Sequence, residues 1–295
     1  MQERTFVDAH GVEVFSRWWL VDDPAGLVVI SHGASEHSGR YDRFATALNG
    51  AGYAVVAIDH RGHGRTGAAT GAGIMGPGAG QAVVDDLDEL RAMALAELGA
   101  DVPVVLFGHS LGAVIGLAYV VQHSADLTAA VLCGFPVDVN GVAGLGELLG
   151  GLAEAGLRDA PASDLLASNN APFEPGRTGF DWLSRDEAEV DRYIADPLCG
   201  DENPLTYGYL IDLFAVVAPA RDALGSITVP VLVIAGDKDS AAENGAHPTG
   251  LAEALRAQGV ATDLTLYPDA RHELLNETNR DEVTADVIGW VQDKA

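Results

Sequence analysis

The chain has 295 residues, of which 48% are hydrophobic and 20% charged, a composition typical of a globular protein with a substantial core. Asp and Glu number 43 against 17 Lys and Arg, which gives a formal net charge of −26. A surface this acidic repels phosphate backbones and anionic lipid headgroups, so it disfavours nucleic acid as a partner and docking on an anionic membrane.

The number of cysteines and the hydropathy of the chain indicate the cellular compartment in which the protein is expected. Cys133 and Cys199 are too few for a disulfide framework, and we expect both to be reduced. Residues 1–6 lack the basic and apolar regions of a signal peptide, so the sequence predicts a cytoplasmic protein. Residues 102–121 carry no Asp, Glu, Lys or Arg and are long enough to span a bilayer. The turn-rich run 108–112 interrupts them, so we predict a buried strand, a turn and a buried helix, with no transmembrane segment.

Short apolar runs alternate with helical patterns along the first half of the chain. The expected strands are 3–8, 12–20, 27–31, 53–58, 102–107 and 127–133. The expected helices are 40–51, 81–98 and 111–123. The last of these helices is apolar nearly all round, which is typical of a buried central helix. The alternation indicates βαβ units and a mainly parallel sheet.

The alternation stops in the middle of the chain and then resumes. Residues 137–215 form irregular segments rich in Gly, Pro, Leu and aromatic residues. The later elements are strands at 229–235 and 262–267 and helices at 250–258 and 281–292. We therefore predict an α/β core formed by 1–136 and 216–295, and an insertion at 137–215 that covers the main sheet as a lid. The alternative is a small independent domain.

The candidate nucleophile lies in residues 108–112, which read Gly-His-Ser-Leu-Gly and match the pattern G-x-S-x-G. In this pattern the serine occupies a tight turn between a strand and a helix, and the expected strand 102–107 and helix 111–123 supply both. Glycines on either side let the turn close because they have no Cβ. We predict that Ser110 is a nucleophile at a helix N-terminus, where the helix dipole favours developing negative charge. The alternative is a Gly/Ser turn in a buried βα unit.

A serine hydroxyl needs a base, and in this kind of fold the acid and the histidine follow on loops after later strands. The next-to-last expected strand is followed by Asp237 and Asp239; either carboxylate could orient the histidine, and we choose Asp239. Only one histidine, His272, follows the last expected strand. His272 would take the Ser110 proton and pass it to the leaving alcohol, while Asp239 would fix its tautomer.

A tetrahedral oxyanion needs two preorganised hydrogen-bond donors. We assign one to the backbone N–H of Leu111, the residue after the nucleophile. The other is assigned to the backbone N–H of Ala34, in the loop that follows the expected strand 27–31. These donors and the three side chains together predict acyl transfer through a covalent intermediate.

Two further patterns carry less weight. Residues 71–76 fit G-x-G-x-x-G, but they neither directly follow a strand nor open a helix, which disfavours a dinucleotide site. His60 and His63 have a spacing seen in metal sites, but no Cys/His cluster lies nearby in the sequence. We therefore expect no metal and no cofactor.

Several stretches together resemble the α/β-hydrolases of the monoacylglycerol lipase and bacterial lysophospholipase group. They are 32–41 (HGASEHSGRY), 59–65 (DHRGHGR), 108–112 (GHSLG) and 267–276 (YPDARHELLN), with a cap-like segment at 182–198. The resemblance implies a mostly parallel eight-stranded sheet flanked by helices, with a helical cap inserted after the sixth strand over an apolar acyl tunnel. It also implies Ser110, Asp239 and His272 as the triad, and Ala34 and Leu111 as oxyanion donors.

The first functional hypothesis is a cofactor-independent carboxylic ester hydrolase. It would cleave a small hydrophobic monoester, such as a monoacylglycerol or a lysophospholipid, through an acyl-serine intermediate. The alternatives are an esterase for another monoester such as a monoalkyl phthalate, a carbon–carbon bond hydrolase, perhydrolase or lactonase on the same triad, and a non-catalytic ligand sensor. Trp182 and Phe214 of the insertion are candidate substrate-binding residues, although packing alone requires the same residue types. The predicted partner is a small-molecule ester.

Overall fold

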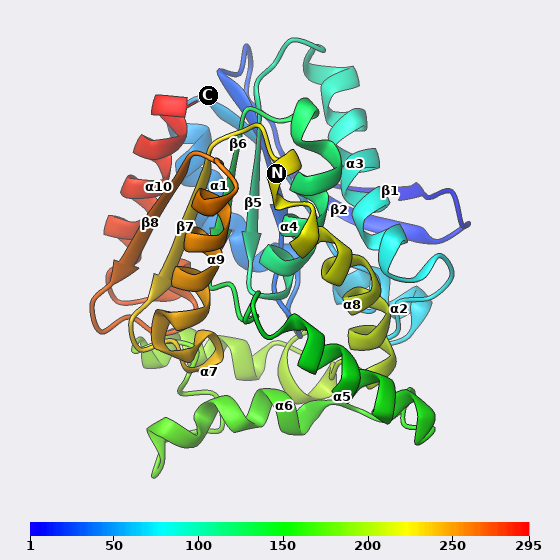
Figure 1. Ribbon diagram of the computed structural model, residues 1–295. Helices are drawn as coiled ribbons and strands as arrows, with labels where there is room; N and C mark the ends of the chain where they lie inside the picture. The colour runs from blue at the N-terminus through cyan, green and yellow to red at the C-terminus, as the bar shows by residue number, and fades with distance from the viewer. Residues whose placement is uncertain (295) are drawn as a thin grey trace.

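Figure 1 shows a twisted sheet at the centre of the computed structural model, which describes residues 1–294. Within this range the sheet has eight strands, in the order β1-β2-β4-β3-β5-β6-β7-β8. The strands are β1 (Gln2–Val7), β2 (Glu13–Trp19), β3 (Gly26–Ser31), β4 (Tyr53–Ile58), β5 (Val104–His109), β6 (Ala129–Cys133), β7 (Val231–Gly236) and β8 (Thr262–Tyr267). The β1–β2 and β2–β4 pairs are antiparallel and the other pairs are parallel, so the predicted sheet is confirmed. Ala295, the last residue of the predicted core segment, lies outside the described residues.

Helices cover both faces of the sheet. Those of the core are α1 (Asp42–Gly50), α2 (Gly64–Thr70), α3 (Ala79–Leu98), α4 (Leu111–His123), α9 (Ala246–Ala257) and α10 (Arg280–Lys294). Apolar residues of α3, α4 and α9 pack on one face, and those of α1 and α10 pack on the other. The strands β3 to β7 are therefore buried along their whole length, which explains their unbroken apolar sequences. The short helix α2 was not predicted.

The insertion between β6 and β7 is helical where the sequence pattern predicted irregular segments. Its helices are α5 (Val142–Glu154), α6 (Ser163–Ala167), α7 (Glu187–Ala195) and α8 (Tyr207–Asp222). Four glycines in α5 lower its intrinsic helix propensity and obscure its pattern. Figure 1 shows α5, α6 and α7 beyond the ends toward which the β7 and β8 arrows point. The boundary expected at 215/216 falls inside α8, which packs on the core through Leu213 and Val217.

The glycine-rich run 71–76 lies against the insertion. A Cβ on Gly73 would lie 2.0 Å from the carbonyl oxygen of Pro204, so the two backbones meet where a side chain has no room. Thr206 Oγ1 also donates a hydrogen bond to the Gly73 carbonyl oxygen at 2.7 Å. This close approach gives the run a packing role beside α8.

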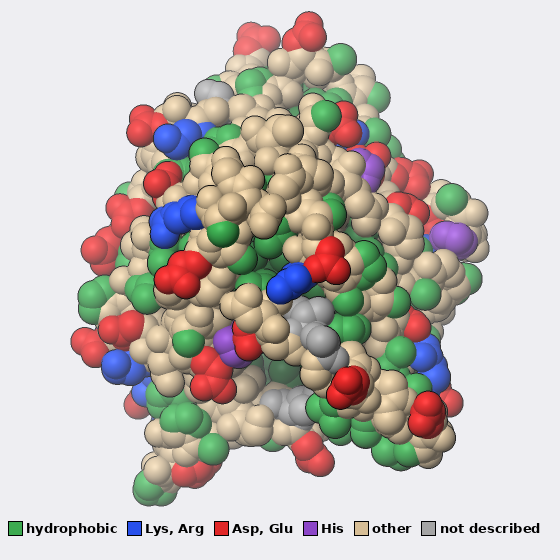
Figure 2. Space-filling view, in the orientation of Figure 1, with side chains coloured by type: hydrophobic (Ala, Val, Ile, Leu, Met, Phe, Trp, Pro, Cys, Tyr) green, Lys and Arg blue, Asp and Glu red, His purple; other side chains and the backbone are tan. Residues whose placement is uncertain are grey.

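The remaining chain-wide predictions concern cysteines, charge and membrane spans. Cys133 and Cys199 are buried and form no disulfide. Figure 2 shows acidic side chains spread over the face of the molecule seen there, with few Lys or Arg between them. Across residues 1–294, no helix combines the length and the apolar character needed to cross a bilayer. The strand, turn and helix predicted for 102–121 are confirmed as β5, Ser110 and α4.

Candidate active site

Ser110 occupies the turn between β5 and α4. Its φ of 52° and ψ of −118° lie outside the common regions for a residue with a side chain, which is typical of a strained turn at a functional site. A Cβ on Gly112 would lie 2.0 Å from the Ser31 carbonyl oxygen, and one on Gly108 would lie 2.4 Å from the Gly112 carbonyl oxygen. Both glycines are therefore required for the turn to close. The Ser110 N–H donates to the Cys133 carbonyl oxygen at 2.9 Å, which ties the turn to β6.

His272 and Asp239 come from the loops after β8 and β7 and lie in contact. His272 Nδ1 is 2.9 Å from each carboxylate oxygen of Asp239, and the two residues are only 2% and 0% exposed. The same carboxylate accepts hydrogen bonds from the N–H groups of Ala241 and Ala242 at 3.1 and 3.2 Å, which fixes its orientation. Because the carboxylate only accepts, Nδ1 carries the proton and Nε2 is free to act as a base.

Asp237, the other acid considered from the sequence, points elsewhere. Its Oδ1 accepts a hydrogen bond from the Asp269 N–H at 2.8 Å and lies 3.6 Å from Lys238 Nζ. The structure therefore brings Asp239, and not Asp237, to His272.

Ser110, His272 and the two predicted oxyanion donors surround one site. Ser110 and His272 line the same cavity, and among the described residues no hydrogen bond joins their side chains. A Cβ on Gly33 would lie 3.3 Å from Ser110 Cβ, so the loop that carries Ala34 runs directly beside the serine. In the described part of the chain, neither the Ala34 N–H nor the Leu111 N–H donates to another protein group. Both N–H groups are available to a ligand.

Two cavities meet at Ser110, Ala34, Leu166 and Trp182. The first has an empty volume of about 750 Å³ and a mixed lining; we call it the polar cavity for its polar side chains, which include Ser35, Glu36, His109, Asp201, His272 and Glu273. The second, of about 1400 Å³, has an almost entirely apolar lining that includes Leu145, Leu149, Leu152, Leu213, Phe214 and Val217. Of the two predicted substrate-binding residues, Trp182 lines both cavities and Phe214 lines the apolar one.

Sequence reasoning missed a buried charged cluster beside Ser110, formed by Glu36, Arg40, His109 and Glu273. Arg40 donates to Glu36 at 2.8 Å and to both carboxylate oxygens of Glu273. Burial alone would raise the pKa of the Glu36 carboxyl, but Arg40 and His109 outweigh it and hold this pKa well below its usual value. The available signal was the presence of charged residues within the family-like stretches 32–41 and 267–276.

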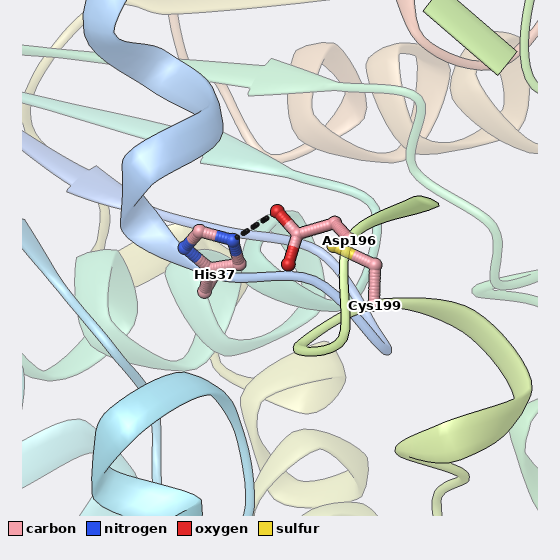
Figure 3. Close-up of side chains that lie close together, drawn as sticks. All are labelled: His37, Asp196 and Cys199. Atoms are coloured by element: carbon pink, nitrogen blue, oxygen red, sulfur yellow. Dashed lines mark hydrogen bonds and ion pairs between the residues drawn. The ribbon is translucent and has the colours of Figure 1, made fainter. Parts of the chain in front are cut away.

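Three potential metal ligands, from His37, Asp196 and Cys199, lie within 4.8 Å of one another. Figure 3 shows these side chains close together. His37 Nδ1 accepts a hydrogen bond from the Gly39 N–H at 3.1 Å, so the ring proton is on Nε2, which donates to Asp196 at 2.9 Å. Burial also raises the pKa of the Cys199 thiol, which disfavours the thiolate that a metal binds. We interpret the group as a hydrogen-bonded link between the 32–37 loop and the insertion.

His60 and His63, which have metal-like spacing in the sequence, are fully buried. His60 Nε2 lies 2.9 Å from Ser31 Oγ, and His63 Nδ1 lies 3.0 Å from the Arg61 carbonyl oxygen. Burial lowers the pKa of His63 to about 3, so its ring is neutral. Both rings pack against His32 beneath the loop that carries Ala34.

The chain is similar in sequence and in structure to known proteins. A family model described as serine aminopeptidase, S33 (Hydrolase_4) matches residues 22–279. A monoacylglycerol lipase of Mycolicibacterium smegmatis is 32% identical, over 98% of this chain and 96% of that protein. Human monoglyceride lipase is 33% identical, over 92% of this chain and 83% of that protein. A solved thermostable carboxyl esterase from Bacillus coagulans, in complex with glycerol, is similar with a TM-score of 0.89 at 27% identity, over 99% of this chain and 98% of that one.

Proposed function

Because this chain belongs to the Hydrolase_4 family (serine aminopeptidase, S33) and is a carboxylic ester hydrolase, we propose that it cleaves monoacylglycerol-like esters at Ser110. The α/β-hydrolase fold and the similarity to monoacylglycerol lipases predicted from the sequence are confirmed. The observation that carries the proposal is the meeting at Ser110 of a large apolar cavity and a smaller cavity whose mixed lining holds several polar side chains. The cytoplasmic location stays a prediction.

The proposed reaction passes through an acyl-serine. Ser110 Oγ turns toward His272 Nε2, gives up its proton and attacks the ester carbonyl carbon. The oxyanion of the tetrahedral intermediate accepts hydrogen bonds from the N–H groups of Ala34 and Leu111. The carbon–oxygen bond to the alcohol then breaks, and His272 gives its proton to the leaving oxygen. Water releases the acid by the same steps, with His272 as the base and Asp239 stabilising its imidazolium.

Each of the two cavities accommodates one half of the ester. The acyl chain occupies the apolar cavity, where its burial is favourable by about 0.8 kcal/mol per CH₂. The leaving alcohol occupies the polar cavity, whose lining includes the side chains of Ser35, Asp201 and His272. Such polar side chains favour an alcohol with further hydroxyl groups over a purely apolar one.

The lining of the polar cavity also carries charge. Of its three carboxylates, Glu36 and Glu273 are paired with the guanidinium of Arg40, whereas among the described residues Asp201 forms no ion pair. An anionic leaving group would therefore be repelled by Asp201, whereas a neutral polyol would not. This argument supports a monoacylglycerol over a lysophospholipid.

A matched pair of esters tests this preference. We expect kcat/KM for a 1-monoacylglycerol to exceed that for the same acylglycerol carrying a phosphate by about 100-fold, which corresponds to one like-charge contact about 6 Å away in a partly buried site. Both esters are measured in neutral detergent micelles at high salt, which screens the long-range field of the acidic surface. Identification of the products by mass also separates ester hydrolysis from lactone or carbon–carbon bond cleavage.

The control is Asp201→Asn, which removes one carboxylate from the cavity. This variant is expected to raise kcat/KM for the phosphate ester, so that the difference in kcat/KM between the two esters becomes smaller. Equal rates for both esters in the wild-type protein would contradict the assignment of the polar cavity to a neutral alcohol.

A further inference from the structure

His109, the residue before Ser110, lies between two hydrogen-bond acceptors. Its Nδ1 is 3.3 Å from Glu36 Oε1, and its Nε2 is 3.3 Å from the backbone carbonyl oxygen of His272. A carbonyl oxygen cannot donate a hydrogen bond. Both contacts therefore require N–H groups on His109 unless Glu36 is itself protonated.

The hydrogen-bond partners of Glu36 show that its carboxyl group is not protonated. Its Oε1 accepts hydrogen bonds from the Gly33 N–H at 2.6 Å and from the Tyr41 hydroxyl at 2.8 Å. Its Oε2 accepts from the guanidinium of Arg40 at 2.8 Å. A carboxyl group that accepts from all these donors is an ionised carboxylate, so both nitrogens of His109 carry protons.

Charged groups from each neighbouring element face His109. The 32–37 loop contributes Glu36, the short helix η1 (Ser38–Tyr41) contributes Arg40 and Tyr41, and the loop after β8 contributes His272 and Glu273. Burial lowers the pKa of His109, but the two carboxylates outweigh burial and the pKa lies above its usual value. The contribution of this proton to stability is therefore fully present below the ordinary histidine pKa and is lost as the pH rises through the elevated pKa of His109.

We propose that His109 is a positioning residue that acts as an imidazolium, joining the turn of Ser110 to the loops that carry the oxyanion donor and the base. One hydrogen bond reaches Glu36, which itself holds the Gly33 N–H next to Ala34. The other hydrogen bond reaches the backbone of His272. This inference rests on the proposed function, because it concerns the geometry of the same reaction.

The ring of His109 also packs beside the base. Its centroid lies 4.9 Å from that of the His272 ring. At higher pH, loss of the His109 proton leaves one of its two acceptors without a donor, and the alignment of the site is lost.

The test compares pH profiles of kcat and kcat/KM for a neutral short-chain p-nitrophenyl ester. For His109→Gln we expect kcat to fall roughly 10- to 100-fold with little change in KM, because the reacting groups are misaligned while the cavities are intact. We also expect the alkaline limb due to His109 to vanish, because glutamine has no proton to lose in this range. His123→Gln makes the same change at the far end of α4 and is expected to leave both limbs in place.

A profile for His109→Gln that keeps the alkaline limb of the wild type would overturn the proposal, since a residue that only packs would change the amplitude alone. Glu36→Gln is the second variant, because it retains His109 and removes the charge that faces it. Its alkaline limb is expected to move to lower pH, and an unmoved limb would also count against the proposal. The proposed function fails separately, through retained turnover in Ser110→Ala.

A measurement on the wild-type protein covers the case in which His109→Gln does not fold. Long-range ¹H–¹⁵N spectra of ¹⁵N-histidine-labelled protein distinguish a doubly protonated ring from a neutral one. In a titration upward from below the ordinary histidine pKa of about 6.5, we expect one buried ring to keep protons on both nitrogens to a higher pH than an ordinary histidine. Spectra in which no buried ring is doubly protonated at any pH of the titration would overturn the proposal.

Discussion

Replacing Ser110 with alanine is expected to lower kcat for a monoacylglycerol by about five to six orders of magnitude. Alanine keeps the Cβ and removes only the hydroxyl that attacks the carbonyl carbon, so the cavities and the N–H groups of Ala34 and Leu111 are unchanged. The measurement is release of the fatty acid at saturating substrate. Thermal unfolding of the variant is recorded as well. We expect its unfolding midpoint to be close to that of the wild type, because the substitution removes no buried contact.

The control for this prediction is Ser226→Ala, which removes a hydroxyl from an exposed position on the short helix η5 (Leu224–Ser226). Its kcat is expected to stay within a factor of about two, because surface substitutions of this kind change stability little. If Ser110→Ala kept more than about one hundredth of the wild-type kcat, a nucleophilic role for this serine would be untenable.

Replacing Asp239 with asparagine is expected to lower kcat by about four orders of magnitude. The carboxylate holds His272 with the proton on Nδ1, because both of its oxygens lie 2.9 Å from that nitrogen. An asparagine can offer its NH₂ group to the same nitrogen, which favours the tautomer that puts the proton on Nε2. The variant therefore loses both the free base and the charge that stabilises the imidazolium. The measurement is kcat for a p-nitrophenyl ester across pH.

Asp237→Asn is the matched control, two residues away on the same loop. Asp237 accepts a hydrogen bond from the Asp269 N–H and lies near Lys238, so its loss is expected to change kcat by no more than a few-fold. Comparable losses in the two variants, or a larger loss in Asp237→Asn, would contradict the choice of Asp239 as the orienting acid.

The sheet was predictable because each of its buried strands has a recognisable sequence of its own. Strands buried on both faces must be apolar along their length, and β3 to β7 are. The turn at Ser110 was also predictable from a short stretch of sequence. Its two glycines are needed because a Cβ at either position would clash with nearby backbone atoms. The helices of the insertion were not predictable from periodicity, because glycines in α5 and the proline in α8 interrupt the pattern.

The charged cluster beside Ser110 could not be derived from the sequence, because its members are far apart along the chain. Glu36 and Arg40 precede the nucleophile by about one quarter of the sequence, and Glu273 lies near the other end. Only the parallel sheet, which brings the loops after β3, β5 and β8 to the same edge, places them together. The choice between Asp237 and Asp239 likewise depends on how one loop turns.

Covalent labelling with a fluorophosphonate, followed by mass mapping of the modified peptide, tests the central claim most directly. The probe reacts with a serine only when a neighbouring base activates it, so it reports nucleophile and base together. We predict one adduct, on Ser110, formed rapidly in the wild-type protein, slowly in Asp239→Asn and not at all in Ser110→Ala. No adduct in the folded wild-type protein, or an adduct on another residue that persists in Ser110→Ala, would contradict the account.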